Sequence, residues 1–204
     1  MKTLIIVDVQ NDFMPGGPLA VPHGDLIVPV INKIQRYFDL IVATQDWHPK
    51  NHKSFASNHF DKKPFNRIIL NGIQQTLWPD HCIQGSAGAE LHRDIESDRI
   101  AAIFRKGMDP EVDSYSGFYD NNRKLSTGLT GYLKEKGVSE VYFCGLAADI
   151  CVYYTILDSI SEGFTSTLIE DASRPLYVEK FDDIKCELAK LGVHIITSDE
   201  LAGN

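Results

Sequence analysis

The sequence predicts an α/β protein built on a parallel sheet of six strands. Short apolar runs rich in β-branched residues alternate with segments in which apolar residues recur at helical spacing. This alternation predicts strand–helix–strand units, whose right-handed crossovers give a parallel sheet covered by helices. The length of 204 residues suits one domain with a sizeable core, so we expect a single domain over residues 1–204. The strand-like runs are 3–9, 40–44, 99–104, 140–143, 165–170 and 193–196.

The first two strands each end in residues that a buried strand should not contain. The run 3–9 is typical of a strand buried on both faces, yet it carries Asp8 near its end. A buried carboxylate requires a partner, so Asp8 is either paired or functional. A helix is expected at about 25–38, and the strand 40–44 that follows leads into the polar sequence 45–48, Gln-Asp-Trp-His.

A long segment between the second and third strands lacks regular hydrophobic periodicity. It runs from about residue 46 to residue 98 and is rich in Asn, Pro, His and Gly. Irregular inserts of this length in a compact domain are usually functional or disordered. The segment contains five aromatic residues that argue against disorder, namely Trp47, Phe55, Phe60, Phe65 and Trp78. We therefore expect a functional insert over 46–98.

The C-terminal half continues the alternation of strands and helices. Helical spacing predicts helices at about 125–136, 150–162 and 178–191, each followed by a glycine that ends it. A tight turn, 144–149, joins the fourth strand to the second of these helices. Asp149 is a candidate N-cap there, which places Cys151 in the first helical turn. The helix dipole and free backbone N–H groups at that position are expected to lower the thiol pKa and to hold an oxyanion.

Composition excludes several classes of partner. The net charge of −8 and the lack of a basic tract argue against binding to nucleic acid or to an anionic membrane. The apolar run 4–7 is too short for a signal or membrane segment. The four cysteines are scattered without a CxxC pair, which indicates a reducing, cytoplasmic setting.

Four reactive side chains follow strand ends in this scheme. In open parallel sheets, ligands bind beyond the carboxyl ends of the strands, where the strand order reverses. Asp8, Asp46, Lys106 and Cys151 all lie at such ends. A thiol nucleophile needs a base and benefits from a cation, roles that suit Asp8 and Lys106. The alternatives are a buried structural cysteine and a solvated surface lysine.

A second constellation is the sequence Asp46-x-His48. In an extended segment these two side chains point to the same side, so both can reach one ion. His52, His59 and His81 lie in the same insert, and a carboxylate with two or three imidazoles suits zinc, iron or manganese. Because surface loops often carry histidines, spacing alone leaves the metal site open.

Five segments of the sequence together carry a resemblance to one family. They are Ile5-Ile6-Val7-Asp8-Val9-Gln10-Asn11-Asp12-Phe13, Gln45-Asp46-Trp47-His48-Pro49, Trp78-Pro79-Asp80-His81-Cys82, Lys106-Gly107 with Tyr115-Ser116-Gly117-Phe118, and Gly145-Leu146-Ala147-Ala148-Asp149-Ile150-Cys151-Val152. In this order, which runs through nearly the whole chain, they resemble the nicotinamidases (pyrazinamidases) of the isochorismatase-like cysteine hydrolases. The combination is specific although each motif alone is weak.

The resemblance implies a Rossmann-like three-layer fold and a set of site residues. It implies a catalytic triad, a divalent metal that is most simply zinc, walls for a substrate ring, an oxyanion hole, and a cis peptide between Leu146 and Ala147. An additional metal ligand, used by some members, would be His52 or Ser54. The implied residues are Asp8, Lys106 and Cys151 for the triad, Asp46, His48 and His81 for the metal, Phe13, Trp78 and Tyr115 for the ring, and the Ala147 and Cys151 amides for the oxyanion.

The implied reaction is hydrolysis of nicotinamide, and of the nearly isosteric pyrazinamide, to the acid and ammonia. It would pass through a thioester and feed NAD salvage. Isochorismatases resemble the scaffold but lack the cysteine, so Cys151 argues against their reaction. The alternatives are an amidase for another small amide or carbamoyl compound, and an inactive binding protein. The Phe13 and Trp78 pair favours a flat ring, and the expected partner is a small molecule, with a homo-oligomer left open.

Overall fold

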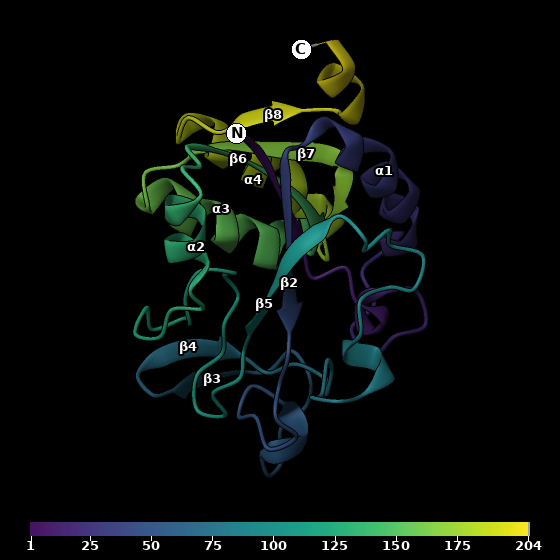
Figure 1. Ribbon diagram of the computed structural model, residues 1–204. Helices are drawn as coiled ribbons and strands as arrows, with labels where there is room; N and C mark the ends of the chain where they lie inside the picture. The colour runs from purple at the N-terminus through teal and green to yellow at the C-terminus, as the bar shows by residue number, and fades with distance from the viewer. Residues whose placement is uncertain (204) are drawn as a thin grey trace.

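The structure is a computed structural model that describes residues 1–203 and confirms the parallel six-stranded sheet. All neighbouring strands in this sheet pair in parallel, in the order β5-β2-β1-β6-β7-β8 (Figure 1). The strands are β1 (Lys2–Val7), β2 (Leu40–Asp46), β5 (Ile100–Lys106), β6 (Glu140–Leu146), β7 (Thr165–Arg174) and β8 (His194–Ile196).

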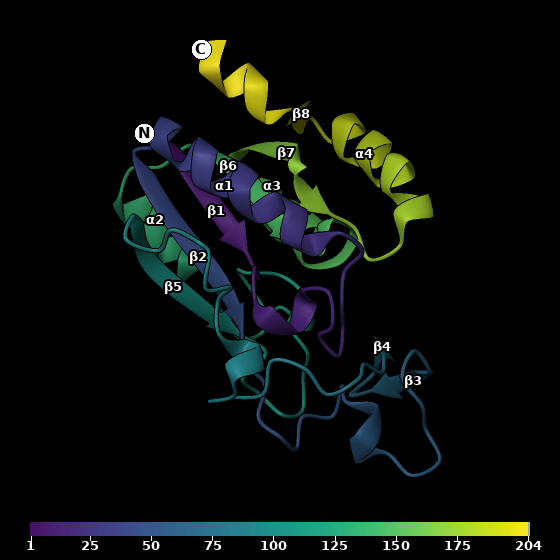
Figure 2. The same cartoon turned by 90° about the vertical axis from the view of Figure 1, so that its right-hand side faces the viewer.

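Helices cover both faces of the sheet and make three layers. Along β1, Leu4 and Ile6 belong to the core under α1 (Ile27–Ile34), whereas Ile5 and Val7 belong to the core on the other face. Successive strand residues point to opposite faces, so a strand buried on both sides must be apolar throughout. The helices of the second face are α2 (Leu129–Glu135), α3 (Tyr153–Ser161) and α4 (Phe181–Lys190). Figure 2 shows α1 lying across the near side of the sheet, with α3 behind it.

The strand order reverses between β1 and β6. From β1 the chain moves outward to β2 and β5, and it then returns to β6 on the other side of β1 and continues to β7 and β8. Such a reversal leaves a crevice at the carboxyl ends of the two central strands. Asp8 directly follows β1, and Cys151 lies in the turn that follows β6. The topology therefore places these two residues on either side of the crevice.

The insert between β2 and β5 lies beyond the carboxyl ends of these strands (Figure 2). It contains an antiparallel hairpin, β3 (Arg67–Leu70) and β4 (Ile73–Thr76), that the periodicity analysis did not predict. Its two-residue turn is Asn71-Gly72, with φ values of 50° and 84°. Asn-Gly is the strongest short hairpin signal. The strands show no hydrophobic alternation because this hairpin is only partly buried and adds little to the core.

The helix boundaries differ from the expected ones in two places. The predicted helix at 25–38 is realised as α1 with a short 3-10 turn on each side, Gly24–Leu26 and Gln35–Tyr37. The helix predicted from residue 125 begins only at Leu129, after Gly128 with φ of 91°. No helix in residues 1–203 is long and apolar enough to span a bilayer.

Candidate active site

Lys106, the last residue of β5, is the centre of a buried charge cluster. Its Nζ lies 2.6 Å from Asp46 Oδ1 and 2.8 Å from Asp8 Oδ2, and its residue is 2% exposed. The same Nζ lies 3.5 Å from Cys151 Sγ and 3.0 Å from the Ser114 carbonyl oxygen, to which it donates. The structure therefore brings the three predicted triad residues together and excludes the reading of Lys106 as a solvated lysine.

Asp8 is held by a hydroxyl that the sequence analysis did not identify. Thr44 Oγ1 donates to Asp8 Oδ1 at 2.6 Å, and it accepts the Asp8 backbone N–H at 3.2 Å. Thr44 lies on β2, beside the point where β1 ends. Asp8 itself adopts a positive φ of 48°, which turns its side chain out of the strand pattern toward the crevice edge. Threonine at a buried position in a strand carries no sequence signal for this role.

Cys151 lies in the first turn of the helical segment after β6, as predicted, but the cap is different. The segment Ala148–Val152 is a π-helical turn that leads directly into α3, and no side chain caps it. The Asp149 carboxylate instead accepts the backbone N–H groups of Leu176 and Tyr177, at 2.7 and 2.8 Å. The prediction of Asp149 as the N-cap is therefore wrong, because these two amides of another loop take its oxygens.

The predicted depression of the thiol pKa is also wrong. Burial raises the pKa of Cys151 well above its ordinary value, and the carboxylates of Asp8 and Asp46 act in the same direction against the opposing charge of Lys106. Desolvation disfavours the thiolate more strongly than the turn and the lysine favour it. A thiol in this position would have to lose its proton to a neighbouring base before it could act as a nucleophile.

The two carboxylates beside Lys106 differ in acidity. Burial raises the pKa of Asp8, and Lys106 only partly offsets this effect. For Asp46 burial also acts upward, but Lys106 and His48 outweigh it and hold its pKa well below the ordinary value. The carboxylates raise the pKa of Lys106 well above its ordinary value in spite of its burial. Asp46 and Lys106 therefore form the permanent ion pair, and Asp8 is the carboxylate suited to exchange a proton.

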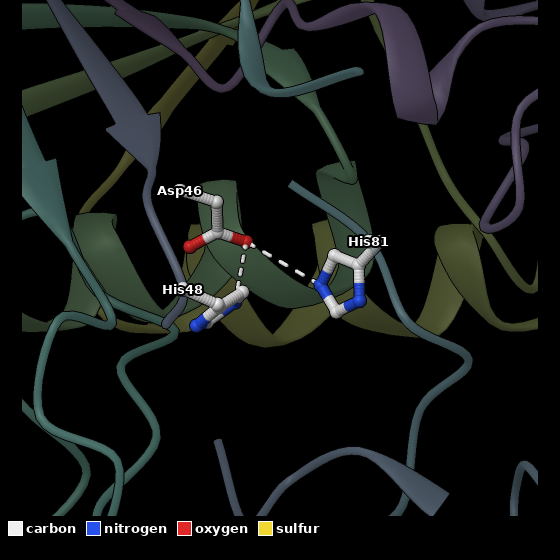
Figure 3. A group of neighbouring side chains, drawn as sticks. All are labelled: Asp46, His48 and His81. Carbon is white, nitrogen blue, oxygen red and sulfur yellow. Dashed lines mark ion pairs between the residues drawn. The ribbon is translucent and has the colours of Figure 1, made fainter. Parts of the chain in front are cut away.

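Asp46, His48 and His81 converge on one point (Figure 3). Asp46 Oδ2 lies 3.5 Å from His48 Nε2 and 3.7 Å from His81 Nε2, and all three residues are buried. Ligand atoms around a tetrahedral zinc ion, each about 2.0–2.1 Å from the metal, lie roughly 3.4 Å apart. The spacing of the three atoms therefore fits a small divalent cation between them.

The tautomers of the two histidines support the same conclusion. His48 Nδ1 lies 2.9 Å from the Gly107 carbonyl oxygen, and His81 Nδ1 lies 2.8 Å from that of Pro79. A carbonyl oxygen only accepts, so each Nδ1 carries a proton and each Nε2 is directed toward the Asp46 carboxylate. Two unprotonated ring nitrogens could face one carboxylate only with a cation between them, either a metal ion or added protons.

The two candidates for an additional metal ligand, His52 and Ser54, are engaged with each other. His52 Nδ1 accepts the Ser54 backbone N–H at 3.1 Å and lies 2.7 Å from Ser54 Oγ, so its ring proton is on Nε2. Within residues 1–203 this Nε2 has no hydrogen-bond partner. Burial and the neighbouring His48 lower the pKa of His52 to about 4. Asp113, which no sequence pattern marked, has a carboxylate oxygen within 4.8 Å of a ring nitrogen of His48 and of His52. Asp113 lies in a loop with no strand end or histidine pattern to mark it.

An apolar pocket opens beside the reactive groups. Phe13, Trp78 and Tyr115 line it, as the resemblance implied, and the rings of Trp78 and Tyr115 meet edge to face with centroids 6.2 Å apart. The pocket reaches Cys151 and two of the candidate metal ligands, Asp46 and His81. Its other lining residues are Leu19, Val21, Asp113, Ala147, Ile150 and Leu176. A flat ring in this pocket would lie between the thiol and the candidate metal position.

The turn that precedes Cys151 has the expected backbone. The peptide bond between Leu146 and Ala147 is cis, as the resemblance implied. Ala147 and Cys151, the residues implied for the oxyanion hole, both line the pocket. Gly145, at φ of 122°, packs so closely on the Val7 backbone that a Cβ there would lie 2.1 Å from the Val7 carbonyl oxygen. Glycine is therefore required for the close approach of β1 and β6 at the crevice.

Comparison with known proteins defines the class to which this fold and site belong. The isochorismatase domain model matches residues 2–200, so the chain belongs to the isochorismatase family. Within that family its relatives include a nicotinamidase of Acinetobacter baylyi, 51% identical over 85% of this chain and 81% of the relative. A nicotinamidase of Escherichia coli is 42% identical over 96% of this chain and 94% of the relative.

Solved structures agree with this relationship. The nicotinamidase and pyrazinamidase of Acinetobacter baumanii superposes with a TM-score of 0.94 at 46% identity, covering 98% of this chain and 97% of the other. A protein of L. infantum in complex with nicotinate has a TM-score of 0.86 at 39% identity, with coverage of 98% and 93%. The pyrazinamidase of Pyrococcus horikoshii in complex with zinc has a TM-score of 0.79 at 38% identity, with coverage of 96% and 98%.

Proposed function

We propose that the protein is an amidohydrolase that converts nicotinamide to nicotinate and ammonia, and that also accepts pyrazinamide. The observation that carries the proposal is the position of Cys151 Sγ, 3.5 Å from the buried Lys106 and at the wall of an aromatic pocket that also reaches Asp46 and His81. The nicotinamidase relatives support the substrate, because they match this chain over most of its length at up to 51% identity.

The proposed mechanism begins with a proton transfer from Cys151 to Asp8. The ligand atoms of Asp8, Asp46 and Cys151 lie within 4.8 Å of one another, and the raised pKa of Asp8 suits a group that takes a proton and returns it. Sγ attacks the carboxamide carbon, and the oxyanion lies against the backbone amides of Ala147 and Cys151. Asp8 then protonates the departing nitrogen, so that ammonia leaves and a thioester remains. Water that Asp8 deprotonates attacks the thioester, releasing the acid and restoring the thiol.

Lys106 balances the charges that develop during these reaction steps. Its ammonium group neutralises part of the negative charge that moves among Cys151, Asp8 and the oxyanion. Its bond to Asp46, at 2.6 Å, holds the ammonium group in place whichever proton state Asp8 adopts.

We further propose that Asp46, His48 and His81 hold one zinc ion. The converging ligand atoms and the two Nδ1–H tautomers support a cation at this point. When bound, the ion would supply a Lewis acid that attracts the pyridine nitrogen of the substrate and orients the ring. Phe13 and Trp78 would then position the carboxamide over Cys151 by enclosing the ring.

The proposal also includes a single domain over 1–204, with the insert 46–98 supplying His48, His81 and Trp78. A cytoplasmic location is proposed with it, in keeping with the four free cysteines of the structure.

The direct test is ammonia release from a panel of small amides. Nicotinamide and pyrazinamide are expected to be hydrolysed at comparable rates, and a ureido or carbamoyl compound much more slowly. Cys151→Ala and Asp8→Asn proteins serve as negative controls for contaminating amidases. A preference for the ureido compound over nicotinamide would replace the proposed substrate, and no ammonia from any amide would favour an inactive binding protein.

A further inference from the structure

The side chain of Gln10 makes two hydrogen bonds to the backbone of Asp46. Gln10 Oε1 accepts the Asp46 backbone N–H at 2.8 Å, and Gln10 Nε2 donates to the Asp46 carbonyl oxygen at 2.8 Å. The second hydrogen of Nε2 goes to the Ala89 carbonyl oxygen, also at 2.8 Å. Gln10 is fully buried, so both amide donors and the amide oxygen are satisfied inside the protein.

This contact replaces strand pairing that β2 has lost. The ladder between β1 and β2 ends at the pair Ile6 and Ala43, so the β1 backbone does not reach Asp46. On its other side β2 continues to pair with β5 as far as Asp46 and Lys106. The Gln10 amide offers one donor and one acceptor to the same residue, as a neighbouring strand would. It therefore holds the end of β2 where the chain leaves the sheet.

Asp46 is the residue at which accurate placement matters most. One carboxylate oxygen lies 2.6 Å from Lys106 Nζ, and the other faces the Nε2 atoms of His48 and His81. A small rotation of the Asp46 backbone would weaken the ion pair and the candidate metal site together. Partners that orient a ligand typically change metal affinity by about 10- to 100-fold when removed.

We propose that Gln10 is the positioning residue that holds Asp46 in register with Lys106 and with the candidate metal site. Gln10 does not line the pocket, so it acts through Asp46 and not on the substrate. The catalytic arm of the test rests on the proposed function, whereas the metal arm does not.

Gln45 provides a matched control. Its Nε2 donates to the same Ala89 carbonyl oxygen, at 2.8 Å, and it is also buried. Its Oε1 accepts from Arg105, and among the hydrogen bonds of the described residues none joins the Gln45 side chain to Asp46. A Gln45→Met variant thus loses its bond to the Ala89 carbonyl oxygen and leaves the hydrogen bonds from Gln10 to the Asp46 backbone intact. Gln10→Met loses its bonds to both residues.

The experiment compares wild type, Gln10→Met and Gln45→Met in zinc affinity, measured by competition with a chelator, and in kcat and KM for nicotinamide. Gln10→Met is expected to bind zinc about 10- to 100-fold more weakly. Its kcat is expected to fall at least about tenfold even at saturating zinc, with KM changed less than about threefold. Gln45→Met is expected to stay within about threefold of wild type in all three quantities.

The proposal is overturned if Gln10→Met keeps wild-type zinc affinity and kcat, or if Gln45→Met loses as much. If circular dichroism shows that Gln10→Met does not fold, Gln10→Glu takes its place in the comparison. Glu keeps the side-chain volume but places a carboxylate oxygen against the two carbonyl oxygens to which Gln10 Nε2 donates. Failure of both variants to fold would assign Gln10 to the core and would also overturn the positioning role. If wild type binds zinc and hydrolyses no nicotinamide, the proposed function fails and the zinc comparison still decides this proposal.

Discussion

Lys106 Nζ lies 2.6 Å from Asp46 Oδ1, closer than its 2.8 Å approach to Asp8. This bond joins two groups that the sequence analysis treated separately, the thiol with its partners and the candidate metal ligands. Because both residues are buried, neither charge can turn to water if the other is removed. A change at either group is therefore expected to affect the other.

Removal of the Lys106 ammonium group should destabilise the protein strongly. Lys106→Met leaves two buried carboxylates without their cation, so we expect a loss of about 3–5 kcal/mol in the free energy of unfolding. Lys33→Met is the control, because Lys33 pairs with Asp199 at side-chain exposures of 58% and 87% and should cost at most about 1 kcal/mol. Urea denaturation at neutral pH measures both. Equal, small losses would mean that the buried cluster is not ionised as described.

The pH profile of activity should reveal the raised pKa of Asp8. Asp8 must be unprotonated to accept the thiol proton, so kcat/KM should fall as pH drops through the Asp8 pKa, which lies above its ordinary value of 3.8. Thr44→Val removes the hydroxyl that lowers this pKa, so the acid limb should move to higher pH. Thr44→Ser keeps a hydroxyl and should stay near wild type. If the acid limb did not move in Thr44→Val, the group that titrates there would not be Asp8.

Cys151 should be the residue whose alkylation stops the reaction. Iodoacetamide is expected to inactivate the enzyme at a rate that rises with pH through the neutral range, because burial raises the thiol pKa. Nicotinamide should slow the inactivation by filling the pocket. Cys186→Ala, at an exposed cysteine, should remain active and equally sensitive. If Cys151→Ala retained ammonia release, another group would have to be the nucleophile.

The zinc content should depend on the histidines that point at Asp46. Elemental analysis is expected to find about one zinc per chain in wild type and a loss of most of it in His81→Ala, because one of three ligands is gone. His92→Ala is the matched control, since His92 lies near Asp94 outside the cluster. Equal zinc content in both variants would move the metal away from Asp46.

Asp113 offers a way to find an additional ligand. Its carboxylate lies close to His48 and His52, and it accepts Gln75 Nε2 at 2.8 Å. Asp113→Asn keeps the volume and removes the charge, so it should weaken zinc binding if this carboxylate acts on the ion. Ser54→Ala tests the other candidate and is expected to leave the affinity within about threefold, because Ser54 Oγ is engaged by His52. If Ser54→Ala weakened zinc binding and Asp113→Asn did not, Ser54 would be the additional ligand.

The parallel sheet, the reactive strand ends and the motif residues could all be predicted without a structure. Strand runs such as 3–9 are apolar on both faces because helices cover both sides, and this local pattern is readable without a structure. The same holds for Asp8 and Lys106, because a charge at the end of a buried strand stands out against its neighbours. The turn Asn71-Gly72 was equally readable, but the partly buried hairpin around it lacked the alternation that the analysis followed.

The interactions among the site residues, in contrast, depend on how the folded chain packs. The thiol pKa rises because the packed crevice removes water from Cys151, and no local helix signal contains that burial. Asp149 does not cap its own segment because amides nearly thirty residues away, at Leu176 and Tyr177, take its oxygens. Thr44 and Gln10 carry ordinary side chains for a buried strand end and a turn. Their roles arise from distances across strands, which depend on how the whole sheet packs.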